Sequence, residues 1–295
     1  MVPAVVGKCK DNSKIIAAPS RSEIAATHPP RLPFSLLSRR RCPAAFQGGK
    51  RGQSPSRSPG GTIPPVSQPT LPTHTVASVH GDFVEWHRGR RHFAVWAIDL
   101  DSPHREATAA ALRRHLAPFL LPGYRRQPHV TVQLCGFPGA GQADDDYPPA
   151  AWQRHLAALA AAAPGPFAIT LGAPASFTTA PYLTVHDDEG GIAALRAALG
   201  PDHLAGPDCT YLPHLTVGLY GGRFPWTAVA RRLASFPAAA ASRIAVTALT
   251  LLRYEAAVVA GPLAAIGRFD LAARAWQALD ADALAPLRDD GGPSG

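Results

Sequence analysis

The sequence contains little cysteine, one methionine and no long apolar run. Its 295 residues include four Cys, and no two of them have the C-x-x-C spacing. Widely spaced thiols argue against a disulfide framework and indicate a reducing compartment. No apolar run reaches the roughly 20 residues that a membrane-spanning helix needs, and residues 1–14 lack the apolar core of a secretory signal. We therefore expect a cytoplasmic protein with no membrane partner.

Lysine is absent after the first fifty residues, and net positive charge is absent from the last two-thirds of the chain. Residues 1–91 carry 14 Lys+Arg against 4 Asp+Glu, whereas residues 92–295 carry 15 against 17. A mildly acidic body argues against an extended surface that follows a nucleic-acid backbone. It does leave room for a local pocket that binds a small anion.

Hydrophobic periodicity is missing from residues 1–90, which are rich in Pro, Ser, Arg and Gly. This composition predicts a disordered basic tail. The tail could be a solvated extension, a transit peptide or a basic arm that gathers RNA. We favour the solvated extension and expect that deleting residues 1–85 leaves the activity of the remaining chain intact.

A pentapeptide occurs twice in the body of the chain, as P-H-V-T-V over residues 128–132 and as P-H-L-T-V over residues 213–217. Each copy lies in an apolar run bounded by turn residues, which is typical of a strand whose side chains alternate between faces. His129 and Thr131 then share one face, and His214 and Thr216 share another. Either histidine alone is more simply a structural residue. The matched pair predicts two imidazole–hydroxyl half-sites.

Strand and helix patterns follow one another from His92 onward, in an order that occurs twice: strand, helix, motif strand, helix, strand. This repetition is typical of a duplicated lobe. We expect a domain over residues 91–275, with lobes over about 92–172 and 173–271, and a C-terminal segment and tail over 276–295. Strands are predicted over 93–100, 130–134, 167–171, 182–186, 215–219 and 244–252, and helices after Ser102 and around Trp152, Ile192 and Trp226.

The two H-x-T strands resemble those of the 2H phosphoesterase superfamily and, within it, the 2′-5′ RNA ligase / RNA 2′,3′-cyclic phosphodiesterase family. The likeness covers about residues 92–271, including the opening strand 93–98, Gly136-Phe137 and the closing stretch 261–269. The resemblance implies an α+β fold in which two β-sheets face each other across a central cleft, with helices outside.

Two imidazoles that titrate near neutrality can act as a general acid and a general base. The resemblance implies a metal-independent cyclic phosphodiesterase that hydrolyses 2′,3′-cyclic phosphate RNA ends or nucleotides to 2′-phosphates, with reversible 2′-5′ RNA ligation as a second reaction of the same groups. It also implies that His129 is the acid, that His214 is the base and that Thr131 and Thr216 bind phosphate. The residues alone do not distinguish the acid from the base.

Two other functions stay open: a non-catalytic RNA-end or nucleotide-binding module, and a related esterase for another substrate such as ADP-ribose cyclic phosphate. A metal site is disfavoured, because no Asp, Glu or Cys accompanies either histidine at ligand spacing. We expect no cofactor, no stable protein partner and a monomer.

Two further residues are candidates for substrate binding. Arg126 precedes the first motif and would supply positive potential, although a solvated turn arginine is the alternative. Tyr220 shares the predicted face of His214 and would stack on a base, although a core aromatic is the alternative. The second motif continues as V-G-L-Y over residues 217–220, where many relatives have an arginine. Contacts made by that arginine are therefore not expected here.

Overall fold

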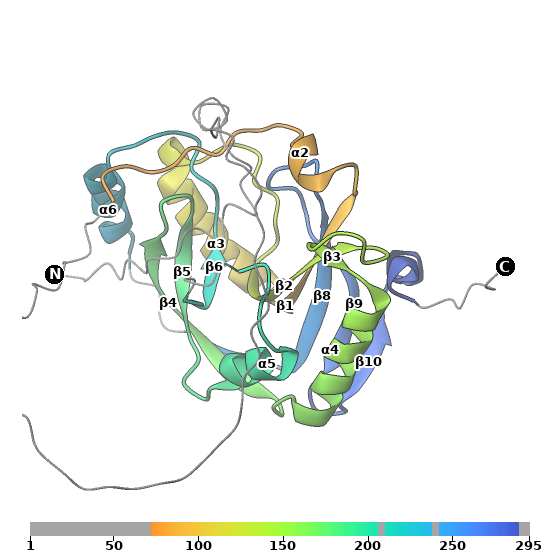
Figure 1. Cartoon of the computed structure of the whole chain (residues 1–295). Helices are drawn as coiled ribbons and strands as arrows, with labels where there is room; N and C mark the ends of the chain where they lie inside the picture. Colours follow the sequence, from red (N-terminus) through yellow and green to blue (C-terminus); the bar gives the residue numbers. More distant parts are fainter. Residues whose placement is uncertain (1–71, 206–209, 238–241, 289–295) are drawn as a thin grey trace, which may run out of the picture. The chain divides into compact units, whose positions relative to one another are not determined.

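The computed structural model describes residues 72–205, 210–237 and 242–288. In this part of the chain, strands form a six-stranded sheet in the order β10-β9-β8-β1-β2-β3 and a four-stranded sheet in the order β6-β5-β4-β7 (Figure 1). The predicted α+β class with two sheets is confirmed. The strands are β1 (His92–Asp99), β2 (His129–Pro138), β3 (Asp146–Tyr147), β4 (Phe167–Ser176), β5 (Pro181–His186), β6 (His214–Thr216), β7 (Ser242–Val246), β8 (Ala248–Glu255), β9 (Ala264–Asp270) and β10 (Ala275–Ala278).

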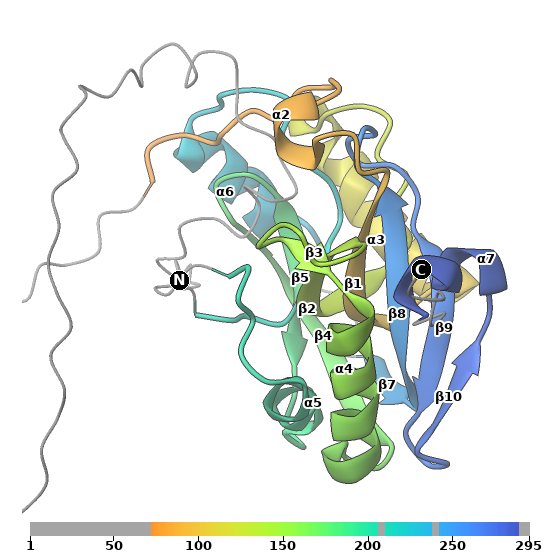
Figure 2. The same ribbon diagram turned by 45° about the vertical axis from the view of Figure 1, so that its right-hand side comes forward.

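Four of the six α-helices in the described ranges begin at a side-chain cap or next to a proline. Ser102 caps the first long helix, since its Oγ accepts a hydrogen bond from Arg105 N at 3.4 Å, and Pro103 fills the first helical position. Figure 2 shows α4 running along the sheets with α5 beside its lower end. The helices are α2 (Val84–His87), α3 (Pro103–Leu116), α4 (Pro149–Ala162), α5 (Gly191–Leu199), α6 (Trp226–Ala234) and α7 (Ala281–Leu284), with 3₁₀ turns η2 (Ala117–Phe119) and η3 (Ala285–Leu287).

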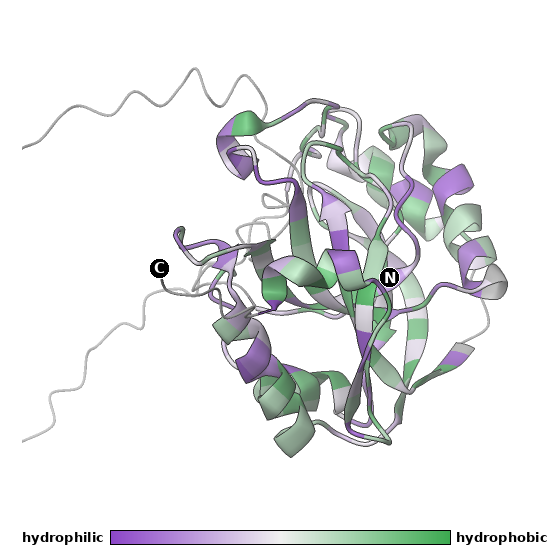
Figure 3. Ribbon diagram, turned by 90° about the vertical axis from the view of Figure 1, so that its right-hand side faces the viewer, coloured by the Kyte–Doolittle hydropathy of each residue, from purple (hydrophilic) through white to green (hydrophobic). Residues whose placement is uncertain are grey.

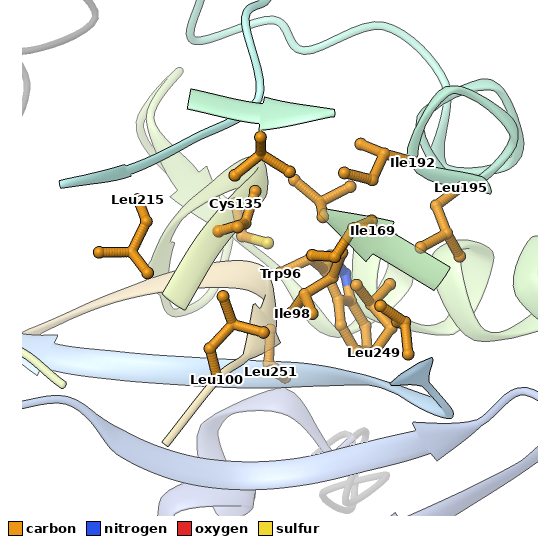
Figure 4. Close-up of a cluster of buried hydrophobic side chains, with 14 of the residues drawn as sticks. Trp96, Ile98, Leu100, Cys135, Ile169, Ile192, Leu195, Leu215, Leu249 and Leu251 are labelled. Carbon is orange, nitrogen blue, oxygen red and sulfur yellow. The ribbon is translucent and has the colours of Figure 1, made fainter. Parts of the chain in front are cut away.

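The main core fills the space between the two sheets. Alternate residues of β1 and β8 meet residues of β4 and α5 there (Figure 4). Full burial of each such side chain contributes about 1.5–3 kcal/mol, so this layer is the main force that holds the sheets face to face. Figure 3 shows the same arrangement by hydropathy: the helices mix hydrophilic and hydrophobic residues, whereas the inner strands are largely hydrophobic. The labelled members of the cluster are Trp96, Ile98, Leu100, Cys135, Ile169, Ile192, Leu195, Leu215, Leu249 and Leu251.

The predicted lobe boundaries are wrong, because the chain exchanges strands between its halves. β4, expected in the first lobe, belongs to the four-stranded sheet, where it pairs with β5 and β7. β8 and β9, expected in the second lobe, belong to the six-stranded sheet, where β8 pairs with β1. The single strand predicted over 244–252 is therefore two strands in different sheets, and the chain changes sheet at Thr247. Hydrophobic periodicity identifies strands but does not say which neighbour completes their hydrogen bonds.

The folded part begins earlier and ends later than predicted. The composition places residues 72–90 in the tail, yet Thr75 and Ser78 are buried, and Ser78 N donates to Tyr220 O at 2.7 Å. At the other end, β10 extends the six-stranded sheet and Leu284 of α7 is buried. The rest of the predicted tail, residues 1–71, lies outside the described residues, as do Cys9, Cys42, Cys209 and residues 289–295.

None of the helices in the described ranges combines the length and apolar character needed to cross a membrane.

Candidate active site

The first motif histidine lies at the start of β2, where Asp99 of β1 is its antiparallel partner. His129 is 8% exposed, and its Nδ1 lies 2.7 Å from the carbonyl oxygen of Gln127. Because a carbonyl oxygen only accepts, Nδ1 carries the proton and the neutral ring keeps its lone pair on Nε2. The Gln127 side chain is held in turn by both backbone polar groups of Leu263, at 2.8 and 3.2 Å. The ring of His129 is therefore oriented by a fixed acceptor.

The second motif histidine lies at the start of β6, opposite Thr184 of β5. Its Nδ1 lies 2.7 Å from the carbonyl oxygen of Leu212, which assigns the same protonated nitrogen as in His129. The ring also meets Phe177 edge-on, with centroids 4.9 Å apart, and Tyr182 at 5.3 Å. A hydrogen bond on one side and aromatic packing on the other fix this imidazole.

The two half-sites line one pocket. His129 and Thr131 from β2 and His214 and Thr216 from β6 all contribute to its wall, and the two strands come close together (Figure 1). The pocket contains about 1000 Å³ of space free of protein atoms, part of which opens to solvent.

Two tyrosines connect the motif strands reciprocally. Tyr211, which precedes the second motif, donates from its hydroxyl to the carbonyl oxygen of Thr131 in the first, at 2.9 Å. Tyr124, which precedes the first motif, donates to the carbonyl oxygen of Thr216 in the second, at 3.3 Å. The separation of the half-sites is thus set by hydrogen bonds in both directions. Sequence reasoning missed both residues, and a tyrosine a few positions before each motif is the signal that could have found them.

Burial controls the charge of the two histidines. The pKa of His129 is lowered to about 4, mainly by loss of hydration; the Gln127 carbonyl opposes this shift, and the nearby charges of Arg126 and protonated His214 contribute to it. Loss of hydration also lowers the pKa of His214. Both rings are therefore neutral near pH 7 while the pocket holds no anion.

Arg126 lines the pocket, as its assignment to substrate binding requires. It is 6% exposed, and its Cζ lies 4.2 Å from the centre of the Tyr254 ring. No carboxylate of the described ranges forms an ion pair with it, and its Nε is buried without a hydrogen-bond partner there. A buried cation without a counter-ion gives the pocket a positive potential.

A second arginine lines the pocket from α5, and the sequence gives no signal for it. The Cζ of Arg196 lies 3.8 Å from the centre of the Tyr211 ring, and its Nη1 donates to the carbonyl oxygen of Val132. The guanidinium therefore holds Tyr211 against β2. Many relatives have an arginine just after the second motif, but neither Arg196 nor Arg126 lies there. The positive charge of this pocket therefore comes from other positions of the chain.

Tyr220 does not take the role predicted for it. The residue is fully buried in the main core, its hydroxyl lies 2.5 Å from Ser176 Oγ, and it does not line the pocket. The strand predicted over residues 215–219 ends at Thr216. The alternation of faces that placed Tyr220 on the same side as His214 therefore does not reach residue 220. Tyr220 is a core residue and not a base-stacking platform.

The first motif strand also departs from simple alternation. Ala97 pairs with Thr131 and Trp96 with Gln133, so one extra residue on β2 forms a bulge. Beyond it Gln133 still lines the pocket, whereas Cys135, predicted on the same face, lies in the main core, where burial raises the pKa of its thiol.

Within the described ranges, no group of three or more His, Cys, Asp or Glu side chains is arranged to hold a metal ion.

The fold and the paired His/Thr half-sites define a class of phosphoesterase-like proteins with two sheets around one pocket. The family model of the 2′-5′ RNA ligase superfamily matches residues 100–257, more than half of the chain. The chain belongs to this superfamily of 2H phosphoesterases.

Several solved structures are similar at low sequence identity. Escherichia coli LigT in apo form is 15% identical, with 62% of this chain and 98% of that chain covered and a TM-score of 0.38. LigT complexed with 3′-AMP is 14% identical, with 61% and 98% covered and a TM-score of 0.41. The protein TT0787 of Thermus thermophilus is 16% identical, with 61% and 98% covered and a TM-score of 0.39. No curated protein matches the sequence significantly.

Proposed function

We propose that the protein is a metal-independent cyclic phosphodiesterase that opens 2′,3′-cyclic phosphates on RNA ends or nucleotides and leaves a 2′-phosphate. The observation that carries the proposal is the matched pair of histidines. Both line one pocket, and both have Nδ1 engaged with a backbone carbonyl, so that Nε2 is the nitrogen left for chemistry. A binding module needs no such pair of titrating groups.

The proposed reaction uses one histidine on each side of the phosphorus. A water oxygen attacks phosphorus while its proton passes to Nε2 of the base, the bond from phosphorus to the ribose 3′ oxygen breaks, and Nε2–H of the acid protonates that oxygen. The product is a 2′-phosphate, and the proton returns to the acid before the next turnover. When the 5′-hydroxyl of a second RNA end takes the place of the water, the same steps join the two ends through a 2′-5′ bond.

The family resemblance makes His129 the acid and His214 the base. An acid must be protonated before it can donate, and burial with Arg126 nearby keeps His129 neutral in the empty pocket. The phosphate supplies what is missing, because an anion near the ring favours its charged form. On this proposal, substrate binding itself loads the proton onto the acid.

Phosphate binding is assigned to Thr131, Thr216 and Arg126. The two hydroxyls are half-buried on the pocket wall, and each comes from a strand whose position a tyrosine fixes. Donors held by a rigid frame need little reorganisation as charge moves onto the phosphoryl oxygens. Arg126 adds a positive charge that no described carboxylate neutralises.

The proposed enzyme is a cytoplasmic monomer whose catalytic domain includes residues 72–288. Its rivals are a nucleotide-binding module without activity and an esterase for ADP-ribose cyclic phosphate. The test is hydrolysis of 2′,3′-cyclic nucleotides in EDTA, with ADP-ribose cyclic phosphate as a parallel substrate. The proposal predicts turnover that survives EDTA, yields the 2′-phosphate and disappears in His129→Ala and in His214→Ala. Binding without turnover would favour the module.

The roles of the two histidines are tested with a substrate whose leaving group needs no proton. Bis(4-nitrophenyl) phosphate releases nitrophenolate, which is stable as an anion at neutral pH. We expect His129→Ala to keep much more of its activity on this ester than on a 2′,3′-cyclic nucleotide, and His214→Ala to lose activity on both. The opposite pattern would exchange the two roles.

A further inference from the structure

Gln133 lies in the same pocket as the half-sites but has no place in the proposed reaction. It follows Thr131 by two residues on β2 and lines the pocket wall. The bulge lies between the two residues, and the side chains of both line the same pocket. A phosphate held at Thr131 would therefore place the sugar or the base of a nucleotide near Gln133.

The side chain of Gln133 carries an unused acceptor. The residue is 2% exposed, and its Oε1 is buried without a hydrogen-bond partner among the described residues. Buried polar atoms of native proteins are nearly always paired, so an orphan acceptor on a pocket wall indicates a partner that arrives with the ligand.

The loop next to Gln133 is built to stay in place. Asp202 also lines the pocket, and its carboxylate accepts hydrogen bonds from the backbone N–H of Leu134 at 3.3 Å, Leu204 at 3.2 Å and Ala205 at 3.1 Å. The first of these bonds ties the loop to the residue that follows Gln133. Gln133 Oε1 and the Asp202 carboxylate thus put two acceptors on this part of the wall, which suits a ligand that brings donors.

We infer that Gln133 determines base specificity by accepting a hydrogen bond from the exocyclic amino group of the substrate base, as adenine and cytosine provide. The inference rests on the proposed function and names its substrate class as amino-bearing nucleoside 2′,3′-cyclic phosphates. A base with a carbonyl oxygen in the same place, such as hypoxanthine or uracil, leaves Oε1 unpaired and sets two acceptors against each other. Discrimination from one such contact is about 10-fold or more.

The experiment compares substrates that differ by this one group. These are the 2′,3′-cyclic phosphates of adenosine and inosine, and those of cytidine and uridine. For the wild type we expect kcat/KM to be at least about 10-fold higher for the amino member of each pair. In Gln133→Leu the ratio should fall to about one, through loss on the amino substrates. The matched control is Gln153→Leu, an exposed glutamine of α4, which should keep the wild-type ratio.

Two outcomes would overturn the inference: a wild type that treats the members of each pair alike, and a preference that survives in Gln133→Leu. Gln133→Met is the second variant, to be used if the leucine variant does not fold by its circular dichroism and melting curve.

Binding keeps this test separate from the test of the proposed function. Calorimetric titration with 2′-AMP and 2′-IMP reads the base contact without any turnover. If no cyclic nucleotide is hydrolysed but 2′-AMP binds at least about 10-fold tighter than 2′-IMP, and only while Gln133 is present, the catalytic proposal fails and the inference about Gln133 stands. Equal binding of the two ligands refutes the role of Gln133 whether or not the protein is a catalyst.

Discussion

His129 and His214 make the same hydrogen bond: each directs Nδ1 at the carbonyl oxygen of the residue two positions earlier, at 2.7 Å in both cases. In both rings Nδ1 is therefore protonated, and Nε2 is left for a ligand. The equivalence follows from the repeated pentapeptide, because each motif strand begins at its histidine and the carbonyl lies just before the strand.

This equivalence predicts the effect of replacing histidine by asparagine. An asparagine amide can donate to the same carbonyl from about the position of Nδ1, but it places nothing at Nε2. We expect His129→Asn and His214→Asn each to unfold within about 1 kcal/mol of the wild type, the scale of one retained hydrogen bond. Their kcat/KM for a 2′,3′-cyclic nucleotide should fall by about 10²–10⁴.

Urea unfolding and steady-state kinetics measure the two quantities. The control is His186→Asn on β5, an exposed histidine outside the pocket, which should keep full activity. A catalytically competent asparagine variant would rule out acid–base chemistry at that position.

The lowered pKa values predict that anion binding is linked to proton uptake. With the pKa of His129 near 4 and that of His214 lowered too, both imidazoles of the empty pocket lose their protons at a lower pH than a free histidine does. A bound anion raises both pKa values, so protons enter with the ligand and the affinity for the anion falls as pH rises from 5 to 8.

Sulfate is a suitable probe, because its charge is constant in this range. Calorimetry in two buffers of different ionisation enthalpy gives the number of protons, which should decrease in His129→Asn. Affinity that does not vary with pH would contradict the electrostatic description of the pocket.

Neighbouring arginines allow a matched test of the positive charge in the pocket. Arg126 is buried on the pocket wall, whereas Arg125 is exposed. We expect Arg126→Met to lose about 10–100-fold in kcat/KM, the equivalent of one hydrogen bond to a charged group, and Arg125→Met to stay close to wild type. The pKa of His129 should rise in Arg126→Met, because the arginine is one of the charges that depress it. Proton NMR of the imidazole follows this shift. Equal kinetics in the two variants would remove Arg126 from the site.

The reciprocal tyrosines give a prediction about geometry. Tyr211→Phe and Tyr124→Phe each remove one hydrogen bond between the motif strands. We expect each to cost about 0.5–1.5 kcal/mol of stability and to lower kcat/KM several-fold. If the two bonds together set the spacing of the half-sites, the double variant should lose more activity than the product of the single losses. Strictly multiplicative losses would mean that each tyrosine acts only on its own strand.

The sequence predicted those features that depend on local pattern. Period-2 and period-3.6 spacing located the first motif strand and the helices α3 to α6, and the repeated pentapeptide brought His129, Thr131, His214 and Thr216 to one pocket. These features need only the alternation of faces and the capping rules.

Long-range pairing was not readable in the same way. The exchange of β4 and β8 between sheets depends on which strands complete each other's hydrogen bonds, and the repeat in the sequence suggested the simpler division into halves. Tyr220 was misplaced because β6 ends after three residues. Arg196 was missed because it reaches the pocket from a helix far from either motif, where nothing in its surroundings distinguishes it from a solvated arginine.

The position of the N-terminal boundary can be tested by truncation. The segment before α2 is bound to the rest of the domain: both Thr75 Oγ1 and its backbone N–H bond to residues 222–224, and Ser78 N bonds to Tyr220 O. A chain that starts at residue 86 lacks these bonds, whereas one that starts at residue 72 keeps them. At about 1 kcal/mol for each bond, we expect the shorter chain to lose at least about 2 kcal/mol and to melt about 4–8 °C lower. Tyr220 is buried below this segment, so fluorescence and amide exchange around it should report the loss. Identical melting curves for the two chains would restore the boundary near residue 90, and with it the expectation that everything before residue 86 is dispensable.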